Sequence, residues 1–82
     1  MAPFFFGLNM DKEKKWKATI YCDFDMKTGA HLLKERVFEI EYFNSKKQAK
    51  VWILKSIVRL EDDHLNQDEW EPLFDYYLQK AN

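Results

Sequence analysis

Apolar and polar residues alternate over Trp16–Phe24, the pattern of a β-strand with one buried face. The segment Asp25–Gly29 that follows is typical of a turn, because its terminal glycine can adopt a positive φ. A second strand is predicted over Lys34–Phe43. The two strands are therefore expected to form an antiparallel hairpin.

The register of this hairpin is predicted from the requirement that the apolar residues of both strands share one face. Pairing Ile20 with Phe38 meets that requirement. It also places Lys17 opposite Glu41, a favourable cross-strand ion pair. The solvent-exposed face is then expected to carry Lys17, Thr19, Tyr21, Glu39 and Glu41.

Helical periodicity begins after Asn44 or Ser45, either of which can cap a helix over Lys46–Leu60. One apolar stripe of this helix can pack on the sheet. A second apolar stripe lies beside the first and consists of Val51, Leu54 and Val58. Another element of the fold is needed to cover this second stripe.

The last segment shows the spacing i, i+3, i+4, i+7, i+8, which predicts a C-terminal amphipathic helix able to cover that second stripe. The connection to it is predicted over Glu61–Gln67, and Pro72 suits its first turn. Its apolar residues are Trp70, Leu73, Phe74, Tyr77 and Leu78.

Pro3–Asn9 is short and aromatic and fits an edge strand. The predicted fold class is therefore α+β, with a small antiparallel sheet of two or three strands packed against a long helix and a C-terminal amphipathic helix. The order is β-β-β-α-α, or β-β-α-α without the first strand. No repeat or linker divides the 82 residues, so residues 1–82 are expected to form a single compact domain.

The composition, with 46% hydrophobic and 17% aromatic residues, excludes a fully disordered chain. Cys22 is the single cysteine, so a disulfide scaffold is excluded as well, and a reducing compartment is expected. No apolar run reaches the roughly 20 residues of a membrane span, and Met1–Met10 lacks the features of a signal peptide. These observations predict a soluble, cytoplasmic protein.

Residues with catalytic or metal-binding chemistry are few and poorly grouped. Cys22 has the parity of a buried strand residue, and His31 and His64 are expected to be solvated. Their spacing does not suit zinc. Glu39 and Glu41 would emerge about 7 Å apart on one strand face, but a small sheet offers no cleft that would raise one pKa. We expect no enzyme activity, no catalytic residues, no metal and no cofactor.

Charge is divided unevenly along the chain. Residues 1–60 contain twelve Lys or Arg and seven Asp or Glu, whereas residues 61–82 contain seven acidic residues and Lys80. Either the two regions neutralise each other in the fold, or they bind charged partners. The candidate site for nucleic acid or an acidic partner is Lys46, Lys47, Lys50, Lys55 and Arg59. The candidate acidic tail for binding a partner is Glu61, Asp62, Asp63, Asp68, Glu69 and Glu71.

The run Ser45-Lys46-Lys47-Gln48-Ala49-Lys50 resembles the start of the final helix in double-stranded-RNA-binding domains. The resemblance lies within Arg36–Leu60, under a third of the chain, and no helix precedes the strands as it does in that family. It implies that phosphates are contacted by Ser45, Lys46, Lys47, Ala49 and Lys50. The predicted order of strands and helix is also similar to the arm-binding domain of phage-type integrases, which reads DNA with its sheet.

Two functions from different classes are consistent with this sequence. The first is a small non-enzymatic protein-binding module, an inhibitor or adaptor acting by shape and charge complementarity. Its size and layout are similar to those of small phage and mobile-element accessory proteins, including anti-CRISPR inhibitors. Its partner would be another protein, such as a nucleic-acid-handling complex. The alternative is a nucleic-acid-binding protein that uses the basic start of the first helix, and either a monomer or a homodimer is compatible with the sequence.

Overall fold

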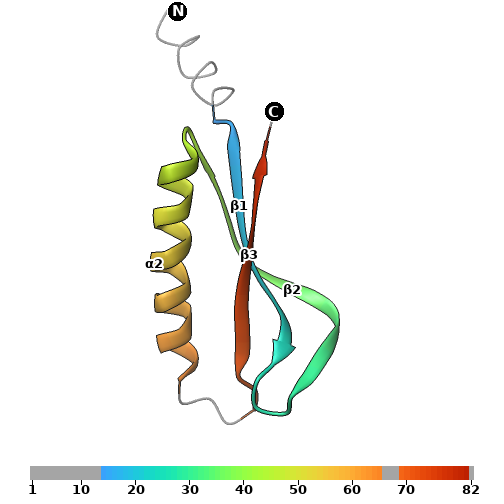
Figure 1. Cartoon of the computed structure of the whole chain (residues 1–82). Helices are drawn as coiled ribbons and strands as arrows, with labels where there is room; N and C mark the ends of the chain where they lie inside the picture. The colour runs from blue at the N-terminus through green and yellow to red at the C-terminus, as the bar shows by residue number, and fades with distance from the viewer. Residues whose placement is uncertain (1–13, 66–68, 82) are drawn as a thin grey trace, which may run out of the picture.

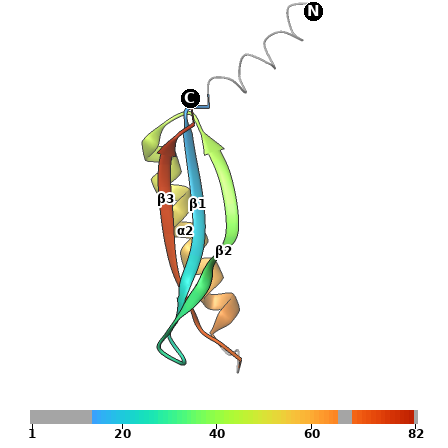
Figure 2. The same ribbon diagram turned by 90° about the vertical axis from the view of Figure 1, so that its right-hand side faces the viewer.

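The computed structural model describes residues 14–65 and 69–81 (Figure 1). The three strands form one antiparallel sheet in the order β2-β1-β3. The helix lies along one face of this sheet, and Figure 2 shows the opposite face, with the strands in front and the helix behind them. The four elements are β1 (Trp16–Asp25), β2 (Ala30–Phe43), α2 (Lys46–His64) and β3 (Pro72–Lys80).

The predicted C-terminal helix is wrong. Residues Pro72–Lys80 form strand β3, and α2 is the one helix among the residues that the structure describes. The order is therefore β-β-α-β, rather than β-β-β-α-α or β-β-α-α. The predicted strand over Pro3–Asn9 lies outside the described residues.

Strand β3 has a physical reason to form where a helix was expected. It pairs with the edge of β1 that β2 leaves unpaired, so the backbone groups on both sides of the central strand are satisfied. The pairing sets Phe74 opposite Cys22 and Leu78 opposite Ala18 on the side facing α2. Proline is tolerated at the first position of a strand, and β3 begins with one.

The predicted hairpin register is also wrong by one residue over Trp16–Ile20, although the pairs Tyr21–Val37 and Cys22–Arg36 agree with it. Ile20 lies opposite Glu39 instead of Phe38, and Lys17 lies opposite Tyr42 instead of Glu41. The cause is a β-bulge in β2, where the register shifts between Ile20 and the residue after it. Because of the bulge, Phe38 still packs on the side of the helix.

The shift exchanges the faces of the β2 residues that follow the bulge, Glu39–Tyr42. Glu39 and Glu41 lie opposite residues of β1 that face α2, so the two carboxylates do not belong to the solvent-exposed face as predicted. Their places on that face are taken by Ile40 and Tyr42, and Val37 lies there opposite Tyr21.

The hydrophobic core fills the space between the sheet and α2 as two clusters. The small side chains of Ala18 and Ala49 allow α2 to approach β1 closely beside Ile53. Trp52 and Ile57 pack against both clusters. The second cluster consists of Ile20, Leu60 and Phe74.

Helix α2 begins where the sequence predicts. The hydroxyl of Ser45 accepts a hydrogen bond from the backbone N–H of Gln48 at 3.2 Å, which confirms Ser45 as the N-cap. The helix continues to His64, four residues beyond the predicted end, so the first part of the predicted connection is helical. Within the described residues, no helix is long and apolar enough to cross a membrane.

Hydrogen bonds to the carboxylate of Asp25 connect the hairpin turn to the start of β3. Its carboxylate accepts hydrogen bonds from the N–H of Glu71 at 2.9 Å, the N–H of Lys27 at 3.0 Å and the hydroxyl of Thr28 at 2.9 Å. The bond from Glu71, followed by the others, lowers the pKa of Asp25. Gly29 closes the turn with a φ of 74°, a conformation that other residues rarely adopt.

Candidate protein-binding surfaces

Two of the predicted basic site residues already have partners within the chain. The ammonium group of Lys46 lies 5.6 Å from the ring centre of Trp16. The guanidinium of Arg59 donates to both carboxylate oxygens of Glu39 at 2.6 Å. Arg59 therefore anchors α2 to β2 and is less suited to bind a partner.

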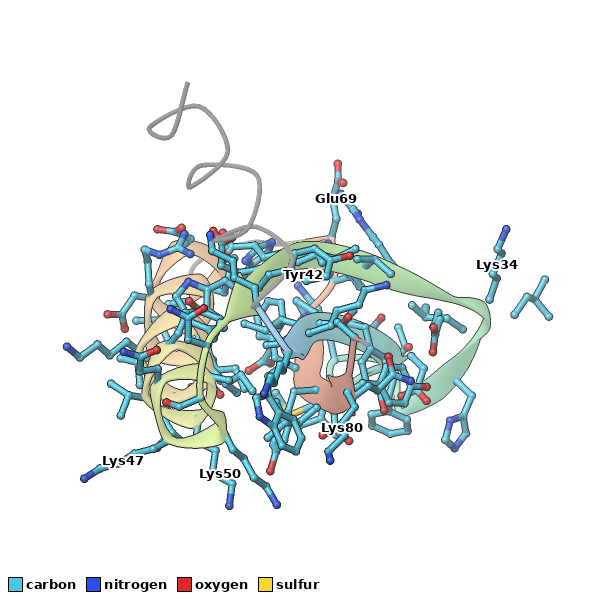
Figure 3. All side chains as sticks on the ribbon, turned by 90° about the horizontal axis from the view of Figure 1, so that it is seen from above. Lys34, Tyr42, Lys47, Lys50, Glu69 and Lys80 are labelled. Carbon is cyan, nitrogen blue, oxygen red and sulfur yellow. The ribbon has the colours of Figure 1, made fainter. Side chains whose placement is uncertain are left out.

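The remaining predicted basic residues, Lys47, Lys50 and Lys55, are exposed on α2. Figure 3 shows Lys47 and Lys50 pointing away from the helix, and Lys80 pointing toward the same side in that view. The ammonium group of Lys80 lies 5.8 Å from the ring centre of Trp16. The sequence prediction missed Lys80, because only the pairing of β3 with β1 brings it to the end of the molecule where α2 begins.

The predicted acidic residues lie toward the opposite end. Glu61–Asp63 are exposed in the last turns of α2, and Glu69 is exposed ahead of β3. Glu71 is exposed too, while its backbone carbonyl accepts a hydrogen bond from the N–H of Met26 at 2.7 Å. Asp68 lies outside the described residues. Helix α2 therefore carries lysines where it begins and carboxylates where it ends.

The open face of the sheet carries the largest group of exposed aromatic and aliphatic side chains on the strands. The rings of Tyr21 and Tyr77 stack with their centres 4.3 Å apart and an interplanar angle of 8°. Four members of the group are 40–47% exposed, whereas Tyr21 is buried between its neighbours. We define this tyrosine patch as Tyr21, Val37, Ile40, Tyr42 and Tyr77.

Carboxylates surround one end of the tyrosine patch. The hydroxyl of Tyr77 donates a hydrogen bond to Glu35 at 2.9 Å, and this contact raises the pKa of Tyr77. Burial raises the pKa of Tyr21, and the nearby carboxylates of Asp75, Asp23 and Glu35 add to the shift. Both phenols are thus protonated at neutral pH, and the carboxylates give this end of the patch a negative charge. The sequence prediction missed the patch because it depends on the register of β2 and on the existence of β3.

A second apolar surface runs along the side of α2 that faces away from the sheet. Val51, Leu54 and Val58 are 45%, 66% and 59% exposed. The predicted C-terminal helix was to cover these residues, and nothing in the described part of the chain does so. A shallow groove of about 400 Å³ lies beside them, lined by Lys47, Gln48, Val51, Trp52 and Lys55.

The residues with catalytic potential have structural contacts. Cys22 is buried, with its Sγ 3.1 Å from the carbonyl oxygen of Phe24. His31 is exposed as predicted, and its ring meets the edge of Phe24. The expectation of a solvated His64 is wrong, because its ring is half-buried against Phe74 and its Nδ1 lies 2.9 Å from the carbonyl oxygen of Leu60. Residues 14–65 and 69–81 contain no group of three side chains able to hold a metal ion.

Comparison of the chain with models of known protein families, with curated proteins and with solved structures finds no match. The function is therefore argued from the surfaces described above.

Proposed function

We propose that the chain is a non-enzymatic protein-binding module, an inhibitor or adaptor, that docks through its tyrosine patch. The partner segment is expected to carry apolar residues and an arginine or lysine. The observation that carries this proposal is the exposed tyrosine patch with carboxylates at one end. Tyrosine is enriched at protein interfaces because its ring buries a large area while its hydroxyl keeps a hydrogen bond.

The chemistry of the patch favours a cationic partner. Tyr77 is 40% exposed and its hydroxyl contacts Glu35, so a guanidinium placed there meets an aromatic ring and a carboxylate together. Asp75, which lies opposite Tyr21 in the sheet, adds a second carboxylate. Val37 and Ile40 supply the apolar contact area beside this charged end.

The scaffold also suits binding. The patch is built on three hydrogen-bonded strands that α2 supports from behind, so little side-chain and backbone order has to be gained on docking. Proteins that handle nucleic acids expose arginine and lysine, and such a protein remains the expected partner. Cys22, buried and free, is compatible with action in the reducing cytoplasm.

Fluorescence polarisation with labelled peptides tests this proposal. One peptide alternates leucine and arginine, and its control alternates leucine and glutamate. We expect the wild-type chain to bind the arginine peptide and not the glutamate peptide. Replacement of Tyr77→Ala together with Glu35→Gln should weaken binding at least about tenfold, the loss typical of an interface hot spot.

The matched control for that variant is Val51→Ala, which removes an equally exposed side chain from α2 and should leave peptide binding unchanged. Equal binding of both peptides, or binding that survives the loss of Tyr77 and Glu35, would refute the proposal.

One observation favours a second candidate function, the binding of nucleic acid at the end of the molecule where α2 begins. There the ammonium groups of Lys46 and Lys80 lie 5.6 and 5.8 Å from the ring centre of Trp16, and α2 also carries the exposed Lys47 and Lys50. An aromatic ring beside several lysines suits a nucleic-acid backbone and a stacked base. The tyrosine patch does not suit phosphates, because its carboxylates would repel them.

Salt dependence distinguishes the two functions. If nucleic acid binds at this end, Lys80→Gln should reduce the slope of log affinity against log salt by nearly one unit for each lost phosphate contact. If the wild-type chain shows no salt-dependent binding to duplex or single-stranded DNA or RNA, this second candidate is excluded.

A further inference from the structure

We infer that two copies of the chain pair through α2, with their helices antiparallel and related by a two-fold axis. This inference goes beyond the proposed function, because it concerns the opposite side of the molecule from the tyrosine patch. The contact surface, called here the outer stripe, consists of Lys47, Val51, Leu54, Val58 and Asp62.

The apolar centre of the outer stripe has the spacing of a helix–helix seam. Val51, Leu54 and Val58 are separated by three and then four residues, so they lie on one side of α2 and can interdigitate with the same side chains of another helix. All three are at least 45% exposed, and no described residue covers them. The groove of about 400 Å³ beside Val51 offers room for an apolar side chain from the second copy.

The charged ends of the outer stripe determine the orientation of the pair. When Val51 of one copy lies opposite Val58 of the other, an antiparallel two-fold pair places Lys47 opposite Asp62 at both ends of the contact. A parallel pair in register would instead place Lys47 opposite Lys47, and like charges would repel. The outer stripe is therefore complementary to itself in the antiparallel orientation.

Helix α2 on its own gives the charges of Lys47 and Asp62 no favourable role. A helix dipole favours carboxylates in the first turn and cations in the last, but the first turn of α2 has no acidic residue and begins with Lys46 and Lys47. Its last turns contain Glu61–Asp63. Lys47 and Asp62 form no ion pair with any other residue in 14–65 or 69–81. An antiparallel second copy supplies Lys47 and Asp62 with the ion-pair partners that they lack.

The size of the contact sets the expected strength. Helix α2 has 19 residues, and a helix of that length spans about 28 Å. One helix on one helix buries less area than a standard interface of about 800 Å² per partner. We therefore expect a reversible dimer with a dissociation constant in the micromolar range.

Sedimentation equilibrium of the full chain over a range of concentrations tests the inference. The wild-type chain should change from monomer to dimer as its concentration rises. Lys47→Asp alone and Asp62→Lys alone should each weaken the dimer at least about tenfold, because each places like charges at both ends of the contact. The double variant should dimerise like the wild type.

Restoration in the double variant is the decisive result. Positions 47 and 62 are about 22 Å apart along one helix, so they cannot compensate each other within one copy. Each single substitution also interacts favourably with the helix dipole, because it places an acidic residue near the start of α2 or a basic residue near its end. Circular dichroism should therefore show that both variants stay folded. A chain that stays monomeric up to millimolar concentration, or a double variant as weak as the single variants, would overturn the inference.

Two further variants separate this inference from the proposed function. Val58→Glu should abolish the dimer and leave binding of the arginine peptide unchanged. The matched control Leu33→Glu alters a fully exposed leucine of β2 outside the outer stripe and should leave the dimer intact. If Leu33→Glu disrupts self-association as strongly as Val58→Glu does, the contact is not made by α2 and the inference fails.

Discussion

Phe74 is the side chain whose removal tests the placement of β3 most sharply. It is 8% exposed, lies in one core cluster with Ile20 and Leu60, and meets the ring of Phe38 edge to face with the centres 4.9 Å apart. Replacing a buried phenylalanine by alanine costs about 3–5 kcal/mol of unfolding free energy. Because β3 is an edge strand, we expect a value near the lower limit, about 3 kcal/mol.

Thermal denaturation followed by circular dichroism measures this cost. For a domain of this size, 1 kcal/mol shifts the melting temperature by roughly 4–8 °C, so Phe74→Ala should lower it by about 12–24 °C. The control is Leu73→Ala at the neighbouring position. Leu73 is 44% exposed on the opposite side of β3, and its loss should cost about 1 kcal/mol or less.

The comparison of these two variants distinguishes a strand from a helix. In β3, Leu73 and Phe74 point to opposite faces of the sheet, so their replacement costs differ strongly. On a C-terminal helix both residues would belong to one buried stripe. Equal losses of melting temperature in the two variants would refute the strand and the packing derived from it.

Two further predictions concern ionisable groups. Because the pKa of Asp25 is lowered, its hydrogen bonds stabilise the fold above the ordinary aspartate pKa of 3.8 and lose this contribution as the pH falls below that value. The melting temperature of the wild type should therefore fall more steeply in acid than that of Asp25→Asn, and parallel curves would contradict the role of this carboxylate. Because Glu35 raises the pKa of Tyr77 above the ordinary value of 10, Glu35→Gln should lower the midpoint of one tyrosine in an ultraviolet titration, whereas the control Glu41→Gln should not. A titration curve that is identical in both variants would exclude the contact between Tyr77 and Glu35.

The parts of the fold that were predicted correctly depend on local patterns. The alternation over Trp16–Phe24, the turn with Gly29 and the cap at Ser45 each concern a few neighbouring residues, and the structure confirms them. The C-terminal segment is compatible with two periods. Leu73, Phe74, Tyr77 and Leu78 have the spacing of one helix face, while alternate residues of the same segment also have the spacing of one strand face. What decides between the two periods is the unpaired edge of β1, which lies about fifty residues earlier in the chain.

The candidate surfaces depended on the same non-local information. Glu39 and Glu41 were placed on the solvent face because a β-bulge cannot be recognised from alternation alone. Once the bulge shifts the register, Ile40 and Tyr42 replace them, and the pairing of β3 brings Tyr77 beside Tyr21. The charge pattern of α2 was visible in the sequence. Its exposed apolar centre was not, because the predicted C-terminal helix was to cover it.

Backbone amide NMR of the isotope-labelled chain, titrated with the leucine–arginine peptide, tests the central claim most directly because it locates the contact. The account predicts that the shifted signals belong to the three strands around the tyrosine patch, with the largest changes near Glu35 and Tyr77, while the signals of α2 stay in place. Changes confined to the acidic end of α2 at Glu61–Asp63, or no changes at saturating peptide, would contradict the claim that the open face of the sheet is the docking surface.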